Sequence, residues 1–360
     1  MKVQRVKIAS HQYIWLVLDN NYFPIQPIET FIRYLHSTEK SPYSILSYAS
    51  HLKLFWEFLE SIHKDWKKIS IADFSGFVFW LRNPNNVVCL KDSLPLKRSE
   101  RTVNTILSAI ASFYRHHNQL GNTNIQLTEA CHLSTNRHKS LLYHVFKHKP
   151  IWKRIISLKA PKTLPKTLNS QKVEKLLKAC CNSRDRFLLT LLYETGIRIG
   201  QALSLRHEDI KSWDNEIHVI FRQNNANCAR NKTRQPNVLH VSPELMLLYT
   251  TYVQDHSSLV KDQPYVFINF QTQEPLAYGA IRKLFVRLYQ KTGIEVTPHM
   301  FRHTHATELI KNGWDAAWVQ KRLGHAHVQT TIDTYTHINQ EDLKQAFKAY
   351  QAKKKNGGLI

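Results

Sequence analysis

The sequence predicts a mainly α-helical protein of two domains, the second of which contains a small antiparallel β-sheet. Apolar residues recur every three or four positions over most of the chain, which is the period of a helix with one buried face. Two short segments in the second half instead alternate apolar and polar residues, as β-strands do, and a polar connection joins them. The chain has 360 residues, which suffice for two domains of ordinary size.

The first part of the chain divides into an arm and a helical domain. Residues 1–24 are predicted to form an N-terminal arm with two short strands, Lys2–Ile8 and Tyr13–Leu18. Residues 25–120 then show helical periodicity almost throughout, so we expect a small domain built from helices alone.

Two serines mark the starts of long helices in this helical domain. Ser41 precedes Pro42, and serine at the N-cap with proline at the first helical position is a common start signal. Another helix is expected to begin at Ser99, because apolar residues then recur at helical spacing up to Tyr114. The segment Ile69–Leu81 is expected to supply a helix between them.

A basic segment follows the helical domain. From Ala130 to Asn169 the chain has nine lysines and arginines and neither Asp nor Glu, and three prolines interrupt it. We expect residues 121–164 to form an interdomain linker or insertion. The charge of the segment favours contact with phosphate groups, the alternative being a solvated loop.

Residues 165–360 are predicted to form the second domain. Its expected elements, in chain order, are a helix around Val173–Cys180, a helix that ends at Gly196, paired strands at Ile217–Phe221 and Val238–Val241, a short strand at Tyr265–Asn269, and helices at Tyr278–Lys291, Pro298–Asn312, Asp315–Leu323, Thr330–Thr336 and from Gln340 to about Lys353. The last helix has an apolar stripe that could dock on a neighbouring subunit or pack on its own domain.

The charge of the chain points to a polyanionic partner. It has 50 Lys and Arg against 27 Asp and Glu, a net charge of +23, and DNA fits better than an anionic membrane surface. No apolar run approaches the roughly 20 residues that a membrane helix requires, and the N-terminus lacks the apolar core of a signal peptide. The five cysteines form no C-x-x-C pair, which favours a cytoplasmic protein with reduced thiols.

Two segments place cationic side chains where a phosphate group could bind. Arg198 lies at the junction of two apolar stretches, although by itself it could equally be a solvated surface residue. His299 and Arg302 are three positions apart, so they share one face of a helix that Thr297 is expected to cap, with Pro298 in its first turn. Free backbone N–H groups at that end of a helix favour an anion.

Two further segments supply a histidine and a tyrosine. The run Arg322-Leu-Gly-His325 predicts a helix that stops at the glycine and presents His325 at its end. Tyr335 follows, but a lone tyrosine is usually a core or surface residue and carries little meaning by itself. The pairs His303–His305 and His325–His327 raise the alternative of a metal site; no carboxylate cluster accompanies them, and we expect no metal.

As a set, these residues closely resemble the tyrosine recombinase, or phage integrase, family, and the resemblance covers about residues 165–350. Members carry an arginine in a G-[IL]-R-x-x-E-A-L-like box, a lysine in a β-hairpin, then H-x-x-R, L-G-H and a tyrosine. The matching positions occur here in the family's order: Arg198, Lys232, His299, Arg302, His325 and Tyr335. The motif wording is most similar to that of transposon-borne integrases.

Two of the matches need comment. Lys232 is the only lysine between the two predicted strands, but three arginines share its loop. Gln201 stands where the family usually has a carboxylate that braces the first arginine. A neutral amide can still accept a hydrogen bond from a guanidinium, but it supplies no charge.

The resemblance implies a helical core-binding domain that binds DNA, followed by a catalytic domain that cuts DNA without metal or cofactor. Tyr335 would attack the scissile phosphate and form a 3′-phosphotyrosyl link, releasing a 5′-hydroxyl. The other implied roles are two arginines that hold the nonbridging oxygens, a lysine that protonates the leaving oxygen, a histidine that exchanges protons with the tyrosine and a histidine that hydrogen-bonds the phosphate: Arg198 and Arg302, Lys232, His299 and His325 respectively.

The resemblance also implies an assembly. A homotetramer would act on two double-stranded DNA sites, with or without accessory recombination proteins, and would pass through a Holliday junction. We favour an integrase or transposase of a mobile element. The alternatives are a DNA-binding architectural protein that lacks catalysis and an enzyme that relaxes DNA as type IB topoisomerases do.

Overall fold

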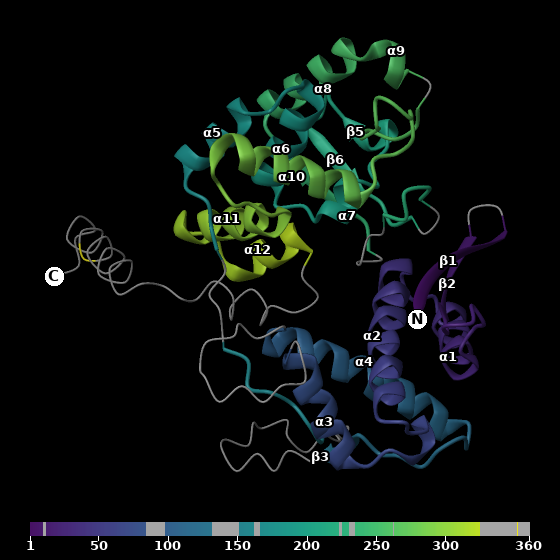
Figure 1. The fold of residues 1–360 in the computed structure, drawn as a ribbon. Coiled ribbons are helices and arrows are strands. Elements are labelled where there is room, and N and C mark those ends of the chain that lie inside the picture. The colour runs from purple at the N-terminus through teal and green to yellow at the C-terminus, as the bar shows by residue number, and fades with distance from the viewer. Residues whose placement is uncertain are drawn as a thin grey trace. The chain divides into compact units, whose positions relative to one another are not determined.

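The computed structural model describes residues 1–9, 12–83, 98–131, 151–161, 166–222, 225–229, 235–261, 263–324 and 351. These residues belong to two compact units, Met1–Lys162 and Thr163–Ile360, each of which is described by itself (Figure 1). Within the described ranges the chain is mainly helical with small antiparallel sheets, which confirms the predicted fold class. No helix in these ranges is both long and apolar enough to cross a membrane.

A β-hairpin opens the first unit and confirms the two predicted strands. β1 (Lys2–Ala9) and β2 (Gln12–Leu18) pair antiparallel, with Val3 opposite Val17. Ile14 and Val17 are buried and join the apolar core of the helices that follow. The hairpin therefore packs on the helices.

The helices of the first unit begin where the sequence predicts. Ser41 and Ser99 are both N-caps, and their hydroxyls accept hydrogen bonds from the backbone N–H groups of Ser44 and Thr102. These side chains satisfy N–H groups that have no partner within the helix. The helices are α1 (Gln26–Ser37), α2 (Pro42–Ser61), α3 (Ile71–Arg82) and α4 (Glu100–Gln119), with a short 3₁₀ turn at Trp66–Lys68.

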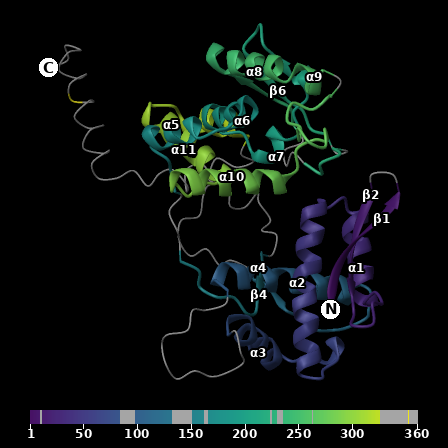
Figure 2. The same cartoon turned by 45° about the horizontal axis from the view of Figure 1, so that its top comes forward.

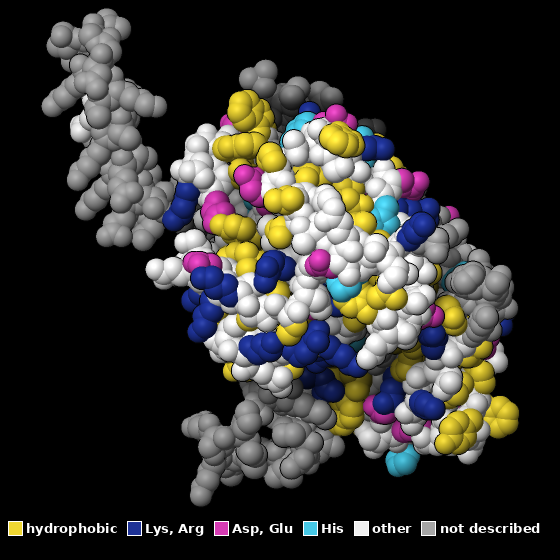
Figure 3. All heavy atoms as spheres, turned by 90° about the horizontal axis from the view of Figure 1, so that it is seen from above, with side chains coloured by type: hydrophobic (Ala, Val, Ile, Leu, Met, Phe, Trp, Pro, Cys, Tyr) yellow, Lys and Arg dark blue, Asp and Glu magenta, His cyan; other side chains and the backbone are white. Residues whose placement is uncertain are grey.

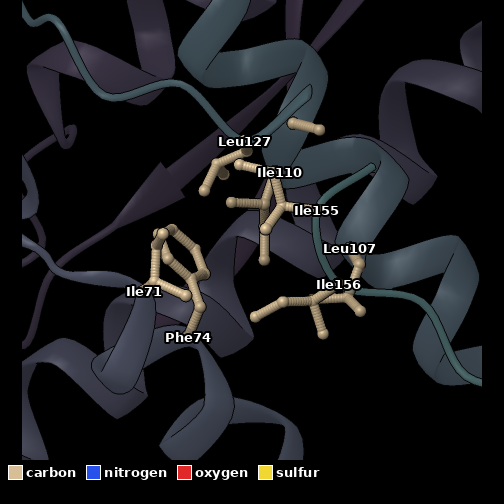
Figure 4. A pocket seen from close by; sticks show the side chains of 8 residues that line it. Ile71, Phe74, Leu107, Ile110, Leu127, Ile155 and Ile156 are labelled. Carbon is tan, nitrogen blue, oxygen red and sulfur yellow. The ribbon is translucent and has the colours of Figure 1, made fainter. Parts of the chain in front are cut away.

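Both ends of the predicted linker pack on the first unit. β3 (Thr128–Cys131) pairs with β4 (Ile151–Arg154) in a two-stranded sheet. Leu127, Ile155 and Ile156 flank this sheet, and their side chains face those of α3 and α4 around an apolar cavity of about 20 Å³ (Figure 4). The boundaries of arm, helical domain, linker and second domain remain predictions.

The second unit is built around α6, whose apolar side chains are buried on all sides. It contacts α5, α8 and α11 (Figure 2). The helices of this unit are α5 (Ser170–Lys178), α6 (Ser183–Thr195), α7 (Ile199–Ala202), α8 (Pro243–Asp255), α9 (Ser257–Val260), α10 (Tyr278–Thr292), α11 (Pro298–Lys311) and α12 (Ala316–Leu323), with a 3₁₀ turn at His207–Asp209.

The predicted strand pair is present in a three-stranded antiparallel sheet. β6 (Glu216–Val219) lies between β5 (Ile210–Lys211) and β7 (Asn237–His240). Ile217 pairs with Leu239, and both side chains are buried. The sheet fixes the two ends of the connection that contains Lys232.

The strand predicted at Tyr265–Asn269 is wrong. The segment makes isolated bridges only, in which Tyr265 pairs with Arg206 and Ile268 with Pro275. The two partners come from different parts of the chain, so no continuous ladder forms, although Val266, Phe267 and Ile268 are fully buried. The helices predicted after Gly324 fall outside the described residues.

Candidate active site

The two predicted arginines, Arg198 and Arg302, both donate hydrogen bonds to backbone carbonyls at the end of α12. Arg302 on α11 is buried, and its guanidinium donates from Nη1 to the carbonyl of Gly196 (2.8 Å) and from Nη2 to the carbonyl of Leu323 (2.7 Å). Arg198 donates from Nη1 to the carbonyl of Gly324 (3.3 Å). The end of α6 and the end of α12 are thereby joined through side chains that lie far apart in the sequence.

Gly196 allows this close approach. It ends α6 in the left-handed conformation (φ +61°), which confirms the predicted helix end. A Cβ built on this glycine would lie 2.8 Å from Cδ2 of Leu323 and 2.9 Å from Cδ2 of His305. A side chain here would therefore push α11 and α12 away from the turn that carries Arg198.

Gln201 supports Arg198 through the backbone. Arg198 is the residue before α7, and its N–H donates to Oε1 of Gln201 (3.1 Å). Gln201 is itself buried, and its carbonyl accepts from the hydroxyl of Ser204 (2.8 Å). The amide that replaces the family's usual carboxylate therefore fixes the main chain of the first arginine.

His299 lies in the first turn of α11, one turn before Arg302, and is exposed to solvent. Thr297 is at the N-cap position with Pro298 after it, as predicted, but its side chain makes no capping hydrogen bond, so the capping prediction is wrong. The Thr297 hydroxyl therefore does not occupy the backbone N–H groups in the first turn of α11. A groove of about 570 Å³ runs from Tyr278 and Arg282 on α10 to this end of α11.

Burial lowers the pKa of the other two histidines of α11. Burial, followed by the charge of Arg322, lowers the pKa of His305 to about 3. Burial also lowers the pKa of His303, with smaller effects from His299 and Arg302. His305 Nε2 accepts a hydrogen bond from Nε of Arg322 (3.0 Å). No three His, Cys, Asp or Glu side chains within the described ranges are grouped so as to hold a metal ion.

Lys232, His325 and Tyr335 lie outside the described residues, but hydrogen bonds fix described residues that precede the first two of them in the chain. The connection before Lys232 begins at Arg222, whose guanidinium forms two 2.7 Å hydrogen bonds to the buried carboxylate of Asp209. His325 follows Gly324, whose carbonyl accepts from Arg198.

A second anchor lies nearer to Lys232. The side chain of Asn227 donates to the carbonyls of Leu203 (2.9 Å) and Leu276 (3.0 Å), and it accepts from the N–H of Ala229 (3.0 Å). No pattern in the sequence indicates this anchor, since an asparagine in a polar loop is usually solvated. The described residues 225–229 of the connection are thus tied to the rest of the second unit.

Arg322 and His305 were not singled out for this site by the sequence. Arg322 precedes the Leu-Gly-His run, where attention falls on the histidine, and His305 appeared only as half of a histidine pair. Their contact joins α12 to α11, and no spacing in the sequence indicates it.

The chain matches two family models, the phage integrase family over residues 166–342 and the phage integrase N-terminal SAM-like domain over residues 28–118. It therefore belongs to the phage integrase family, the tyrosine recombinases. Among its relatives, transposase A from transposon Tn554 of Staphylococcus aureus is 42% identical over 363 residues, which cover 99% of each chain. Tyrosine recombinase XerA of Pyrococcus furiosus is 30% identical over 54% of this chain and 64% of its own.

Solved structures share the fold of this chain. A post-cleavage complex of the XerH site-specific recombinase with palindromic difH substrate has a TM-score of 0.59 at 20% identity, covering 86% of this chain and 80% of that one. The Tn1549 transposon integrase in complex with circular intermediate DNA has a TM-score of 0.58 at 15% identity, covering 90% and 98%. At these identities the likeness concerns the fold.

Proposed function

We propose that the protein is a site-specific recombinase of a mobile element, which breaks and rejoins double-stranded DNA through a 3′-phosphotyrosyl link at Tyr335. The observation that carries this proposal is the convergence of Arg198 and Arg302 on the backbone at the ends of α6 and α12. The relation to the Tn554 transposase over 99% of both chains supports the choice of a mobile element.

The two arginines supply the positive charge that phosphoryl transfer requires. In the proposed step the phenol oxygen of Tyr335 bonds to phosphorus while the bond from phosphorus to the 5′-oxygen breaks. Negative charge then spreads over the nonbridging oxygens, and the guanidiniums of Arg198 and Arg302 stabilise it. Their fixed hydrogen bonds to backbone mean that little reorganisation accompanies the step.

Proton transfer completes the step. A phenol has an ordinary pKa of about 10, so Tyr335 needs help to lose its proton, and the exposed imidazole of His299 serves as the acid–base group. Lys232 gives a proton to the departing 5′-oxygen, and His325 donates a hydrogen bond to the phosphate. The phosphodiester energy is kept in the phosphotyrosyl bond, so the 5′-hydroxyl of a partner strand can reverse the step without ATP, metal or cofactor.

The basic surface of the second unit suits DNA. α5 and α10 contact each other and expose lysines and arginines: Lys172, Lys175, Lys178, Arg282, Lys283 and Lys291. In the view of Figure 3, Lys and Arg side chains gather in adjoining groups, with fewer acidic side chains among them. Binding through such contacts weakens steeply as salt rises, because counterions are released from the phosphates.

We propose a homotetramer on two sites, with a Holliday junction between successive strand exchanges.

A nicked suicide substrate tests the proposal. A duplex that spans one end of the element, nicked close to the scissile phosphate, loses the short fragment after cleavage and traps the covalent complex. We expect the wild-type protein to form a complex that resists denaturing gels, and Tyr335→Phe to form none. Tyr43→Phe, a change at an exposed tyrosine of α2, is the matched control and should behave as wild type. EDTA should leave the yield unchanged.

The outcomes separate the alternatives. DNA binding by the wild type without any covalent complex would support the architectural protein instead. Relaxation of a supercoiled plasmid that lacks the element's ends would support the topoisomerase-like enzyme. Loss of the complex in EDTA would contradict the metal-free step.

A further inference from the structure

We infer that Arg322 is a positioning residue for strand cleavage, because it fixes the backbone carbonyls to which Arg198 and Arg302 are hydrogen-bonded. The inference rests on the proposed function, since it concerns the same site. Arg322 lies in the last turn of α12, just before the residues that accept from the two arginines.

The guanidinium of Arg322 bonds three different elements. Its Nε donates to Nε2 of His305 on α11 (3.0 Å). Its Nη2 donates to the carbonyl of Glu194 in the last turn of α6 (3.3 Å) and to the carbonyl of His240 at the end of β7 (3.2 Å). One planar side chain thus holds α12 against α6, α11 and the sheet, which is a geometry that the fixed fork of arginine favours.

The backbone carbonyls of Arg322 and of the two residues after it all accept hydrogen bonds. Its own carbonyl accepts from Nδ2 of Asn237, the first residue of β7 (3.2 Å). The carbonyls of the next two residues, Leu323 and Gly324, accept from Arg302 and Arg198. Three consecutive carbonyls are therefore engaged, and a shift at position 322 would move the acceptors of both site arginines.

The partner of Arg322 on α11 is a neutral acceptor. His305 is buried, and the charges of Arg322 and Arg302 add to burial in lowering its pKa to about 3, so Nε2 keeps its lone pair at neutral pH. A hydrogen bond to the backbone of Tyr193 fixes the ring from the other side. The contact therefore orients Arg322 without a carboxylate.

The same contacts reach the hairpin. β7 is the strand into which the chain returns after Lys232, and both of its ends bond to Arg322: Asn237 to the carbonyl and His240 to the guanidinium. Arg322 thus links the segments that carry Arg198, Lys232 and Arg302. A displacement of about 1 Å at a reacting centre can lower a rate on the order of 10²-fold.

The test measures cleavage and binding separately on the full chain. The suicide substrate is supplied at saturating protein, and the single-turnover rate of covalent complex formation is compared with the DNA affinity from gel shift. For Arg322→Met, which keeps the length of the side chain but removes its donors, we expect a rate lower by on the order of 10²-fold. Its DNA affinity should stay within about threefold of wild type, because Arg322 acts within the site.

Arg184→Met is the matched control. Arg184 is also buried and also donates to a backbone carbonyl, that of Ile268 (2.7 Å), but it lies in the first turn of α6, at the opposite end from Gly196. We expect this variant to unfold at a lower temperature than wild type and to cleave at an unchanged rate per folded molecule. A similar rate loss in both variants would mean that Arg322 matters only for stability, and would overturn the inference.

Two further variants keep the inference decidable. Arg322→Lys retains one donor and should recover part of the rate; it also serves if Arg322→Met does not fold. In an Arg198→Ala background, Arg322→Met should cost less than in wild type, because one of the two arginines that it positions is already absent. Full multiplication of the two effects, or a wild-type rate in both Arg322 variants, would overturn the inference. If the wild-type protein forms no covalent complex at all, the proposed function itself fails.

Discussion

Gly196 ends α6 close to side chains of α11 and α12. We expect Gly196→Ala to lower the free energy of unfolding of the second unit by about 1–3 kcal/mol, because alanine is strained in the left-handed conformation and its Cβ meets side-chain atoms of Leu323 and His305. Gly293, at the end of α10, has a similar φ (+69°), but a Cβ added there would meet no atom within 4 Å, so Gly293→Ala isolates the conformational cost. Urea unfolding of both variants measures the difference, and equal losses would contradict the steric argument.

At the candidate site, motifs in the sequence sufficed to propose residues, but they did not indicate the contacts that those residues make. The motif order sufficed to select Arg198, His299 and Arg302, since each belongs to a recognisable run. It could not indicate that Arg302 would bond the carbonyl of Gly196, because this contact depends on how α6 and α11 pack. The contact of His305 could not be predicted for the same reason, because its partner Arg322 comes from another helix.

At the scale of elements, an ion pair with a buried carboxylate holds Arg222, where the connection that contains Lys232 begins. Asp209 is almost fully buried, and it accepts two hydrogen bonds from Arg222 and one from the N–H of Arg206 (2.9 Å). We expect Asp209→Asn to destabilise the second unit by about 3 kcal/mol, because it leaves the Arg222 charge without its buried partner. Thermal or urea unfolding measures the loss.

Glu208 provides the control for that change. Its exposed carboxylate also accepts from Arg222 (2.8 Å), but solvent screens the pair, so Glu208→Gln should cost less than about 1 kcal/mol. Comparable losses in the two variants would show that burial of Asp209 is not what makes the pair matter.

Elements were predicted well where a local signal marks them. Ser41 and Ser99 cap helices as expected, and the alternation around Ile217 marks a strand. α8 was overlooked although Ser242, its N-cap, precedes Pro243 just as Ser41 precedes Pro42. The strand expected at Tyr265–Asn269 failed because a buried apolar run does not reveal whether a partner strand lies beside it.

At the scale of the whole molecule, acid should weaken both units, because each contains a buried histidine whose pKa is lowered, His116 in the first unit and His305 in the second. His116 is buried in α4, its ring stacks on that of Tyr34 with centroids 4.4 Å apart, and burial lowers its pKa. An unfolded histidine has a pKa of about 6.5, so the stability that depends on neutral His116 is complete above that pH and is lost as the pH falls below it. Amide hydrogen exchange along α4 in the full chain should therefore speed up between pH 7 and pH 5, after correction for intrinsic exchange.

A variant tests the assignment to His116. Its buried Nε2 has no hydrogen-bond partner among the residues that the structure describes, so phenylalanine can take its place beside Tyr34 without leaving a polar atom unpaired. His116→Phe should make the protection of α4 less dependent on pH, and an unchanged dependence would contradict the argument. Asp73 does not interfere, because hydrogen bonds from Lys64 and Ser70 lower its pKa to about 2 and its contribution is lost only in more acidic solution.

The division into a helical first half and a mixed second half followed from periodicity, and the net charge of +23 pointed to DNA before any site was known. The packing of the two ends of the predicted linker on the first unit was harder to predict. Ile156 lies in the basic, proline-interrupted stretch and Leu127 just before it, and local composition cannot show that such residues complete a core formed by α3 and α4.

The partners of the arginines divide them into two groups with different electrostatic effects. Arg222 is held by the carboxylates of Asp209 and Glu208, which cancel its field within a few ångströms. Arg302 and Arg198 instead donate to the carbonyls of Gly196, Leu323 and Gly324, which are neutral groups and orient a guanidinium without cancelling its charge. If the two arginines hold the phosphate as proposed, these hydrogen bonds orient their guanidiniums before DNA arrives, so part of the ordering cost is already met by folding.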